Sequence, residues 1–313
     1  MKRYLLIILA GAAYFAGISI CCAYDWGLIS LSPNDVHMQA VNQELDKIES
    51  SGVKPAAVVP SPLVPKTYEF TFGPELYWAK YDEPKNMYQK GFMSGYNAQF
   101  SQRINTDPKS LINMFRLQGQ WAKGKFKTQS SDQGPSGIKD NTFELRGVLG
   151  KDFYPASYMR TTGYFGFGYR YLKDNSEGLT TVTDDYTLIG YRRFSHYCYL
   201  PLGADIVYQR APNYSLESNL EYDYMFNGWH VSKLGDVPGY STLVVDQRNG
   251  NGLRASLRLN LYLKYCTAFA EWFYRYWNIP QSKSKPDPTD PANSLNEPKN
   301  NTQEFGLRLG IQI

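Results

Sequence analysis

The chain has 313 residues, of which 42% are hydrophobic and 15% aromatic, yet its mean hydropathy is only -0.46. After the first twenty or so residues no apolar run approaches the roughly 18 residues that a spanning helix needs, which excludes a bundle of transmembrane helices. The aromatic content argues against disorder. Lys and Arg total 33 against 29 Asp and Glu, with no basic block, so no nucleic-acid partner is expected.

The N-terminus has the pattern of a secretion signal. Lys2 and Arg3 precede the apolar run 5–20, and small residues before Ala23 suit cleavage after it. An uncleaved anchor helix is the alternative, but the run is short and no positively charged flank follows it. We therefore expect residues 1–23 to be a signal peptide.

Cleavage after Ala23 would remove Cys21 and Cys22 and leave Cys198 and Cys266. An oxidising compartment permits a disulfide between them. The strand assignment below places them on strands that are not neighbours, so we expect two free, buried thiols.

Residues 24–65 are expected to lie in the periplasm. Ser32-Pro33 has the chemistry of a helix start, and apolar residues then recur at helical spacing as far as Ser50. Residues 51–65 carry four prolines and predict a stiff linker. The helix is either part of a poorly ordered tether or a short oligomerising element, and His37 within it is expected to be solvated.

From Thr67 onward the pattern changes to strict alternation. In the last strand Phe305, Leu307 and Leu309 point one way, while Glu304 and Arg308 point the other. A period of two with charges on one side indicates a sheet that is wet on one face. The polar face is too charged for a soluble core, and the other face is rich in Tyr, Phe and Trp, as is typical where lipid covers a sheet.

The alternation predicts an all-β fold, a transmembrane antiparallel up-and-down β-barrel of about ten strands that spans residues 66–313, preceded by the short N-terminal helix. An even strand number places both ends in the periplasm, and the connections alternate between short turns and longer polar loops. Only a closed sheet satisfies its backbone in lipid. The expected strands are 67–82, 90–105, 111–127, 141–153, 159–173, 186–209, 215–232, 251–263, 267–279 and 302–313.

Two further expectations follow from this assignment. Pro74 and Pro201 fall inside strands of a barrel that has no edge, which predicts a bulge or a break in the ladder at each. Several strands exceed the 9–11 residues needed to cross a bilayer, so they should project into the extracellular space.

The layout resembles Gram-negative outer-membrane β-barrel proteins, and most of all the ten-stranded omptins. The local likeness is Gly228-Trp229 followed by a loop that opens at Asp236. Omptins are surface proteases with an Asp-His pair in this loop, but Asp236-Val237-Pro238 lacks the histidine. Loop 128–140, which would hold the family's second acidic pair, offers only Asp132 and Asp140. The resemblance therefore implies the fold and argues against that chemistry.

The inward-facing charges are the most informative chemistry in the sequence. Every base among them is Arg, whose planar fork suits paired carboxylates. We expect these side chains to cross-link and fill a narrow lumen, and general acid/base catalysis or an ion-selective constriction is the alternative. The expected network comprises Glu69, Glu75, Arg116, Glu144, Arg146, Arg170, Asp205, Glu221, Asp223, Arg254, Arg258, Glu271, Arg275, Glu304 and Arg308.

Counting from the turn near Pro212 brings His196 and His230 almost opposite each other at the extracellular rim, with Asp236 nearby. Together they could form a metal site, a proton-transfer pair or a phosphate-binding rim for lipopolysaccharide. Two solvated surface histidines are the alternative. The sequence Glu-Pro-Lys-Asn, at 83–86 and again at 297–300, predicts two loops that barrel closure makes neighbours.

We therefore expect an integral protein of the cell outer membrane that is not an enzyme and acts as a narrow pore, a surface-binding protein or a structural anchor. The competing hypothesis is a membrane-embedded hydrolase at the extracellular rim, either an omptin-like protease or an enzyme that modifies lipid A. No cofactor or metal is expected. The expected partners are outer-membrane lipid and lipopolysaccharide, and the assembly machinery that would contact the C-terminal strand.

Overall fold

A computed structural model describes residues 66–84, 87–103, 110–129, 136–182 and 187–313. The chain divides into two units, Met1–Pro60 and Ser61–Ile313, and every described residue belongs to the second. The predicted signal peptide, periplasmic helix and linker lie outside the described residues. Within the described ranges, no helix is both long and apolar enough to cross a membrane.

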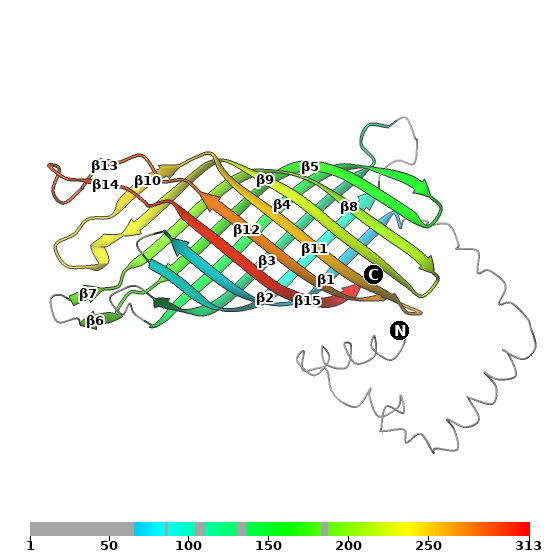
Figure 1. The fold of residues 1–313 in the computed structure, drawn as a ribbon, viewed down its shortest axis with the longest axis horizontal. Helices are drawn as coiled ribbons and strands as arrows, with labels where there is room; N and C mark the ends of the chain where they lie inside the picture. The colour runs from blue at the N-terminus through cyan, green and yellow to red at the C-terminus, as the bar shows by residue number, and fades with distance from the viewer. Residues whose placement is uncertain (1–65, 85–86, 104–109, 130–135, 183–186) are drawn as a thin grey trace, which may run out of the picture. The chain divides into compact units, whose positions relative to one another are not determined.

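The described unit is built almost entirely of β-strands (Figure 1). Ten of them form the ring: β1 (Tyr68–Glu83), β2 (Met87–Arg103), β3 (Met114–Gln129), β4 (Ser136–Ala156), β5 (Met159–Asn175), β8 (Arg192–Ala211), β9 (Tyr214–Lys233), β11 (Gly250–Tyr262), β12 (Thr267–Ile279) and β15 (Asn300–Gln312). The shorter elements are β6 (Thr180–Val182), β7 (Thr187–Ile189), β10 (Leu243–Gln247), β13 (Lys285–Pro286), β14 (Ser294–Leu295) and the 3-10 turn η1 (Leu234–Asp236).

Each ring strand pairs antiparallel with its neighbours in chain order, and β1 pairs with β15 to close the sheet. Trp78 of β1, for example, lies opposite Phe305 of β15. The C-terminus lies at one end of the barrel, and the hairpins β6–β7 and β13–β14 extend the other end (Figure 1). The predicted ten-stranded, up-and-down closure is confirmed. Because periplasmic turns are short and extracellular loops long, the end with these hairpins is extracellular.

Side chains are distributed inside out compared with a soluble protein. Along β11, Leu253 and Leu257 are 42% and 48% exposed, whereas Arg254 and Arg258 are only 7% and 8% exposed. The same inversion holds around the ring, where the exposed large apolar residues lie on the outer face and the buried arginines and carboxylates face the lumen. A continuous apolar exterior of this size is stable only against lipid.

A β-bulge changes the phase of β9. Cys198 of β8 lies opposite Asn227, but the next residue, Tyr199, lies opposite Met225, so Phe226 is the extra residue. Inward positions of β9 are therefore odd-numbered below the bulge and even-numbered above it. Beyond this point β10 takes over from β11 as the partner of β9.

Both prolines interrupt the ladder, as predicted. Pro74 pairs with Tyr96 of β2, but it and Gly73 are missing from the ladder with β15. Pro201 pairs with Asp223 of β9, but the ladder with β5 skips from Leu202 to Tyr199. Each proline therefore stays paired with one neighbouring strand and is unpaired on its other side, which suits a residue without a backbone N–H.

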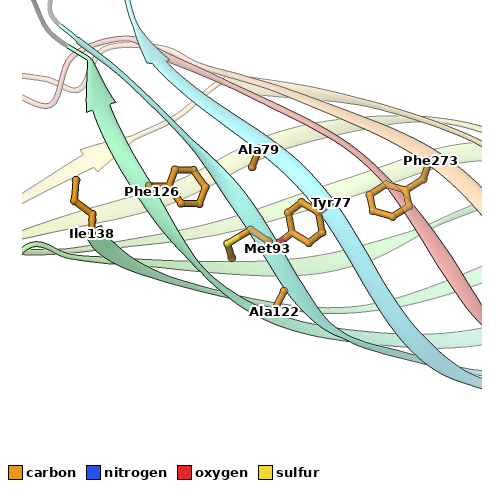
Figure 2. Packing of buried hydrophobic residues seen from close by; sticks show 7 residues of the cluster. All are labelled: Tyr77, Ala79, Met93, Ala122, Phe126, Ile138 and Phe273. Carbon is orange, nitrogen blue, oxygen red and sulfur yellow. The ribbon is translucent and has the colours of Figure 1, made fainter. Parts of the chain in front are cut away.

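The ring strands are 13 to 21 residues long, more than a bilayer crossing needs. The lumen carries a small apolar cluster in the extracellular half of β1–β4, closed on one side by Phe273 of β12 (Figure 2). Its members are Tyr77, Ala79, Met93, Ala122, Phe126, Ile138 and Phe273.

Candidate functional site in the barrel lumen

All fifteen residues of the expected lumen network occupy inward-facing positions of the ring strands, and ion pairs bind them together. The period-two alternation that builds each strand also aims these side chains inward, because each lies two, four or six residues from another inward residue. Chain neighbours on one strand therefore contribute to successive layers of the lumen.

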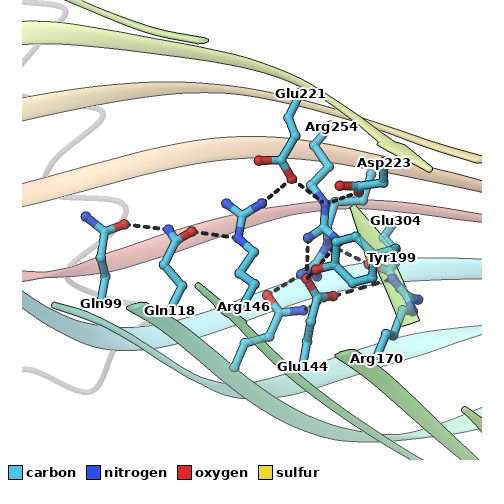
Figure 3. Close-up of polar contacts among 12 residues, drawn as sticks. Gln99, Gln118, Glu144, Arg146, Arg170, Tyr199, Glu221, Asp223, Arg254 and Glu304 are labelled. Atoms are coloured by element: carbon cyan, nitrogen blue, oxygen red, sulfur yellow. Dashed lines mark hydrogen bonds and ion pairs between the residues drawn. The ribbon is translucent and has the colours of Figure 1, made fainter. Parts of the chain in front are cut away.

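One group of contacts centres on Arg254 of β11 (Figure 3). Its guanidinium lies 2.6 Å from Asp223, 2.7 Å from Glu144 and 3.2 Å from Glu221. The Tyr199 hydroxyl donates to Glu144 at 2.6 Å. Since Glu144 belongs to β4, four strands away around the ring of ten, Arg254 ties distant parts of the wall together.

A second group centres on Glu304 of β15 (Figure 3). Arg170 of β5 and Arg275 of β12 each contact its carboxylate, at 2.5 Å and 2.6 Å. The Arg170 guanidinium also lies 5.3 Å from the Trp277 ring, and that of Arg275 lies 4.5 Å from the Phe273 ring. β5 and β15 are five strands apart in a ring of ten, so the Arg170–Glu304 contact crosses the full width of the lumen.

The periplasmic half is held by a third group. Arg308 bridges Glu75 at 2.9 Å and Glu271 at 2.7 Å, and Arg258 also binds Glu271. Nearby, Arg116 of β3 contacts Asp205 of β8 at 2.6 Å. Arg103 joins Glu69 and Asp152 at 3.1 Å and 2.8 Å. Most of these charges are buried, so each requires its partner.

The cavities between these layers are small. One of about 70 Å³ lies beside Gln118, Glu144 and Arg275. A second of about 70 Å³, lined mostly by apolar atoms, lies on the extracellular side of Arg170 and Glu304. A third, of about 330 Å³, opens beside Glu217, Arg258 and other residues at the periplasmic end. A dry cavity that holds a benzene ring measures about 150 Å³, so neither of the two smaller cavities accommodates an organic solute.

The extracellular rim carries a further polar cluster. Arg193 of β8 contacts Glu83 of β1 at 3.1 Å and Asp174 of β5 at 2.6 Å. The Tyr81 hydroxyl donates to Glu83 at 2.8 Å and lies 3.4 Å from Glu297. The glutamates of the two Glu-Pro-Lys-Asn copies therefore meet at one tyrosine, as neighbouring loops allow.

His230 completes this rim cluster. Its Nε2 lies 3.2 Å from a Glu297 oxygen, and its Nδ1 lies 2.8 Å from the Ser195 hydroxyl, the residue directly opposite on β8. Burial raises the pKa of Glu297 to about 7, against the opposing effect of Arg193. Among the described residues no group of His, Cys, Asp and Glu is arranged to hold a metal ion.

The structure does not bring His196, His230 and Asp236 together. His196 faces outward, stacks on Trp229 with ring centroids 4.5 Å apart, and shares a 2.7 Å hydrogen bond with the Tyr169 hydroxyl. Asp236 lies in η1, where hydrogen bonds from Arg192 lower its pKa. The expectation of a shared site is therefore wrong, because the Phe226 bulge turns the His230 side chain inward while that of His196 stays on the outer face.

The two cysteines also need one correction. Both are free, as expected, but neither is buried. Cys198 faces outward on β8, and Cys266 lies in the turn between β11 and β12. Of the two aspartates in loop 128–140, Asp140 lies on the inward face of β4 and Asp132 lies outside the described residues.

Sequence reasoning missed several lumen residues that the alternation could have identified. Arg193 lies in phase with Asp205 on β8, and Asp152 lies in phase with Glu144 on β4. Arg103 ends β2 in phase with the inward-facing Asn97. For Glu83 and Glu297, the one indication in the sequence that they lie close together is the repeated tetrapeptide Glu-Pro-Lys-Asn.

No protein-family profile and no curated protein matches the chain. Among solved structures, it is similar to the toluene transporter TbuX of Ralstonia pickettii, with 9% identity and a TM-score of 0.38 over 83% of this chain and 93% of that one. The translocator domain of the autotransporter NalP from Neisseria meningitidis gives 9% identity and a TM-score of 0.38 over 89% and 99%.

A third similar structure is Ail, the attachment invasion locus protein of Yersinia pestis, with 12% identity and a TM-score of 0.28 over 79% of this chain and 100% of that one. All three likenesses concern the fold alone. The closed antiparallel sheet, its apolar exterior and its charged interior identify this chain as a ten-stranded β-barrel of the outer membrane.

Proposed function

We propose that this barrel is not an enzyme and does not conduct solutes, and that it acts as a structural anchor and surface-binding protein of the outer membrane. The observation that carries the proposal is the Arg170–Glu304–Arg275 layer, which joins opposite walls of the lumen with buried charges. A solute that passed this layer would have to separate ion pairs in a confined space.

The magnitude of that barrier supports a closed lumen. Breaking a buried pair by removal of one partner costs about 3–5 kcal/mol, because it leaves an uncompensated charge. Arg170 and Arg275 share one carboxylate and also lie against aromatic rings, so their displacement would break several contacts at once. The lumen is therefore a reinforced core, and the exterior and rim are available for binding.

A liposome-swelling assay tests closure. We expect liposomes that contain the protein to swell no faster in a small sugar than empty liposomes do. The double variant Arg170→Ala, Arg275→Ala removes both cations of the layer and should swell faster if it folds. Its folding is checked by retention of the β-sheet circular dichroism spectrum. Rapid swelling with the unmodified protein would contradict the proposal.

A second candidate function rests on a separate observation, the chain Ser195–His230–Glu297. A hydroxyl, an imidazole and a carboxylate follow in the order of a serine nucleophile, its base and an orienting acid. The His230 Nδ1 contact with Ser195 is a hydrogen bond, whereas its Nε2 lies near Glu297 without forming one. Both Ser195 and His230 line the apolar extracellular cavity. In an ester hydrolase, Ser195 Oγ would attack the acyl carbon, His230 Nδ1 would take its proton and return it to the leaving alcohol, and water would release the acyl group.

The surroundings disfavour this second function, because the carboxylates of Glu83, Asp174 and Glu297 lie around Arg193 and oppose a developing oxyanion. A fluorophosphonate probe decides between the two functions. We expect no labelling of the folded protein. Labelling that is lost in Ser195→Ala and kept in Ser232→Ala, an inward serine on the same face as His230, would establish the hydrolase instead.

A further inference from the structure

Six lysines gather on the outward face of four adjacent strands at the extracellular end of the barrel. Their positions follow from the alternation, since each is flanked by inward-facing residues such as Ala79 and Phe126. All except Lys80 are well exposed. This lysine patch comprises Lys80 of β1, Lys90 of β2, Lys123, Lys125 and Lys127 of β3, and Lys139 of β4.

The strand register places these lysines directly opposite one another. Lys80 pairs with Lys90, and Lys90 pairs with Lys127, so a row of three crosses β1, β2 and β3. Lys125 pairs with Lys139 in the adjacent row. Side chains that are directly opposite lie about 5 Å apart at Cβ, and like charges in that arrangement are destabilising.

Few acidic groups offset these charges. Asp82 is the one acidic residue among the described outward positions of β1–β4, and it pairs with Lys80 at 3.4 Å. No ion pair joins the other five lysines to a residue that the structure describes. A patch with this much uncompensated charge is stable when an anion from outside the chain covers it.

Aromatic side chains lie beside the patch toward the membrane centre. Trp121 precedes Lys123 on the same face of β3, and the Lys123 ammonium lies 5.8 Å from its ring centroid. Phe92, which is 70% exposed, lies directly opposite Lys125. Exposed Tyr96 and Phe143 continue the band on β2 and β4. On these strands the outward positions change from apolar residues to lysines beyond Phe92, Trp121 and Phe143. The lysines therefore begin where the apolar exterior ends, which is the height of the lipid phosphates.

We propose that the lysine patch binds the phosphate groups of an acylated glycolipid of the outer leaflet, the lipid A part of lipopolysaccharide, while the aromatic band contacts its acyl chains. The occupant follows from three features together: uncompensated positive charge, a position at the headgroup level, and an apolar surface directly below. This inference rests on the proposed surface-binding function and specifies the ligand and the face that binds it.

The test is a binding titration of fluorescent, bis-phosphorylated lipid A with the protein in neutral detergent micelles. The variant Lys90→Gln, Lys125→Gln, Lys127→Gln removes three cations from the two rows. The matched control Lys264→Gln, Lys283→Gln, Lys299→Gln removes the same charge from exposed lysines outside the patch. Each lysine near an anionic lipid surface raises the affinity about fivefold. The loss of three should therefore weaken binding of the patch variant by on the order of a hundredfold, whereas the control variant should bind almost as well as the unmodified protein.

Three outcomes would overturn the inference. Equal affinity of the patch variant and the control variant would show that the patch does not bind the lipid. Equal affinity of the unmodified protein for lipid A without phosphates would show that the phosphates are not recognised. Full competition by inorganic phosphate at a concentration similar to that of lipid A would show that the patch binds a simple anion and does not recognise the lipid. The liposome-swelling result is independent, so failure of the closed-lumen proposal is distinguishable from failure of this one.

Discussion

The guanidinium of Arg170 donates a 2.5 Å hydrogen bond to the carboxylate of Glu304, although 134 residues separate them in the chain and their strands lie on opposite sides of the ring. At the extracellular rim, Arg193 and Glu83 make the same kind of contact between β8 and β1, again five strands apart. Opposite walls of the barrel are therefore joined at two levels. The barrel wall and the ion pairs across it should unfold as one cooperative unit.

Loss of the central acid should destabilise the barrel strongly. Glu304→Gln leaves Arg170 and Arg275 buried without their shared carboxylate, so we expect the free energy of unfolding to fall by about 3–5 kcal/mol. Urea titration in lipid vesicles, followed by tryptophan fluorescence, measures this change. The control Glu177→Gln removes an exposed partner of Arg192 and should change stability by less than about 1 kcal/mol. Equal effects of the two variants would contradict a cross-linked lumen.

The rim should be more stable in mild acid. Burial raises the pKa of Glu297 to about 7, above the value of roughly 4.3 in an unfolded chain. Between these values the folded state binds a proton that the unfolded state does not, so stability is greatest below about pH 4 and falls as the pH rises through about 7. The opening free energy of the rim strands, obtained from hydrogen exchange after correction for the pH dependence of the intrinsic exchange rate, should therefore be higher at pH 5 than at pH 8.

Glu297→Gln keeps the shape of that side chain but has no proton to lose. It should remove most of the difference in opening free energy between pH 5 and pH 8, which we expect to be on the order of 2 kcal/mol. Gln303→Glu, at an outward position of β15, serves as a control for added charge. An unchanged pH dependence in Glu297→Gln would assign the effect to another group.

Gly73 should tolerate no side chain. A Cβ at this position would overlap the Leu309 carbonyl oxygen and the Gly310 backbone of β15. We expect Gly73→Ala to cost about 1–3 kcal/mol or to prevent folding. Gly163→Ala on β5 meets no atom within 4 Å and should leave the urea midpoint unchanged. Equal urea midpoints of the two variants would show that the close approach of β1 and β15 at Gly73 does not exclude a side chain.

The two cysteines offer a test of membrane orientation. Cys198 faces outward at lipid depth on β8, whereas Cys266 lies in a turn at the end that carries the C-terminus. A water-soluble maleimide should therefore modify Cys266 only after the outer membrane is permeabilised, and Cys198 only after denaturation. An added Thr289→Cys, in the loop at the opposite end, should react in intact cells. Reaction of Cys266 in intact cells would invert the assigned orientation.

Much of the fold could be predicted from the sequence because one signal repeats along the whole barrel. The alternation in Leu253, Arg254, Leu257 and Arg258 indicates both the strand and the face that meets lipid, and the same rule places all fifteen network residues in the lumen. The ladder breaks at Pro74 and Pro201 followed from the missing N–H of proline. These features depend on local chemistry, which a single sequence contains.

The rest depended on information that alternation does not contain. The Phe226 bulge reverses the phase of β9, so counting from the Pro212 turn placed His230 beside His196 when it lies on the other face. The partner of each charge was also not predictable, because Arg170 could reach several carboxylates until the ring positions of β5 and β15 were known. One inserted residue and the closure geometry therefore decide which side chains meet.

The most direct test of the central claim is single-channel recording in a planar lipid bilayer. With the Arg170–Glu304–Arg275 layer intact, we predict a flat current trace at moderate voltage, and steps should appear only in the Arg170→Ala, Arg275→Ala variant. Stable, uniform current steps from the unmodified protein would contradict the account, because ions would then be crossing a lumen that we describe as filled.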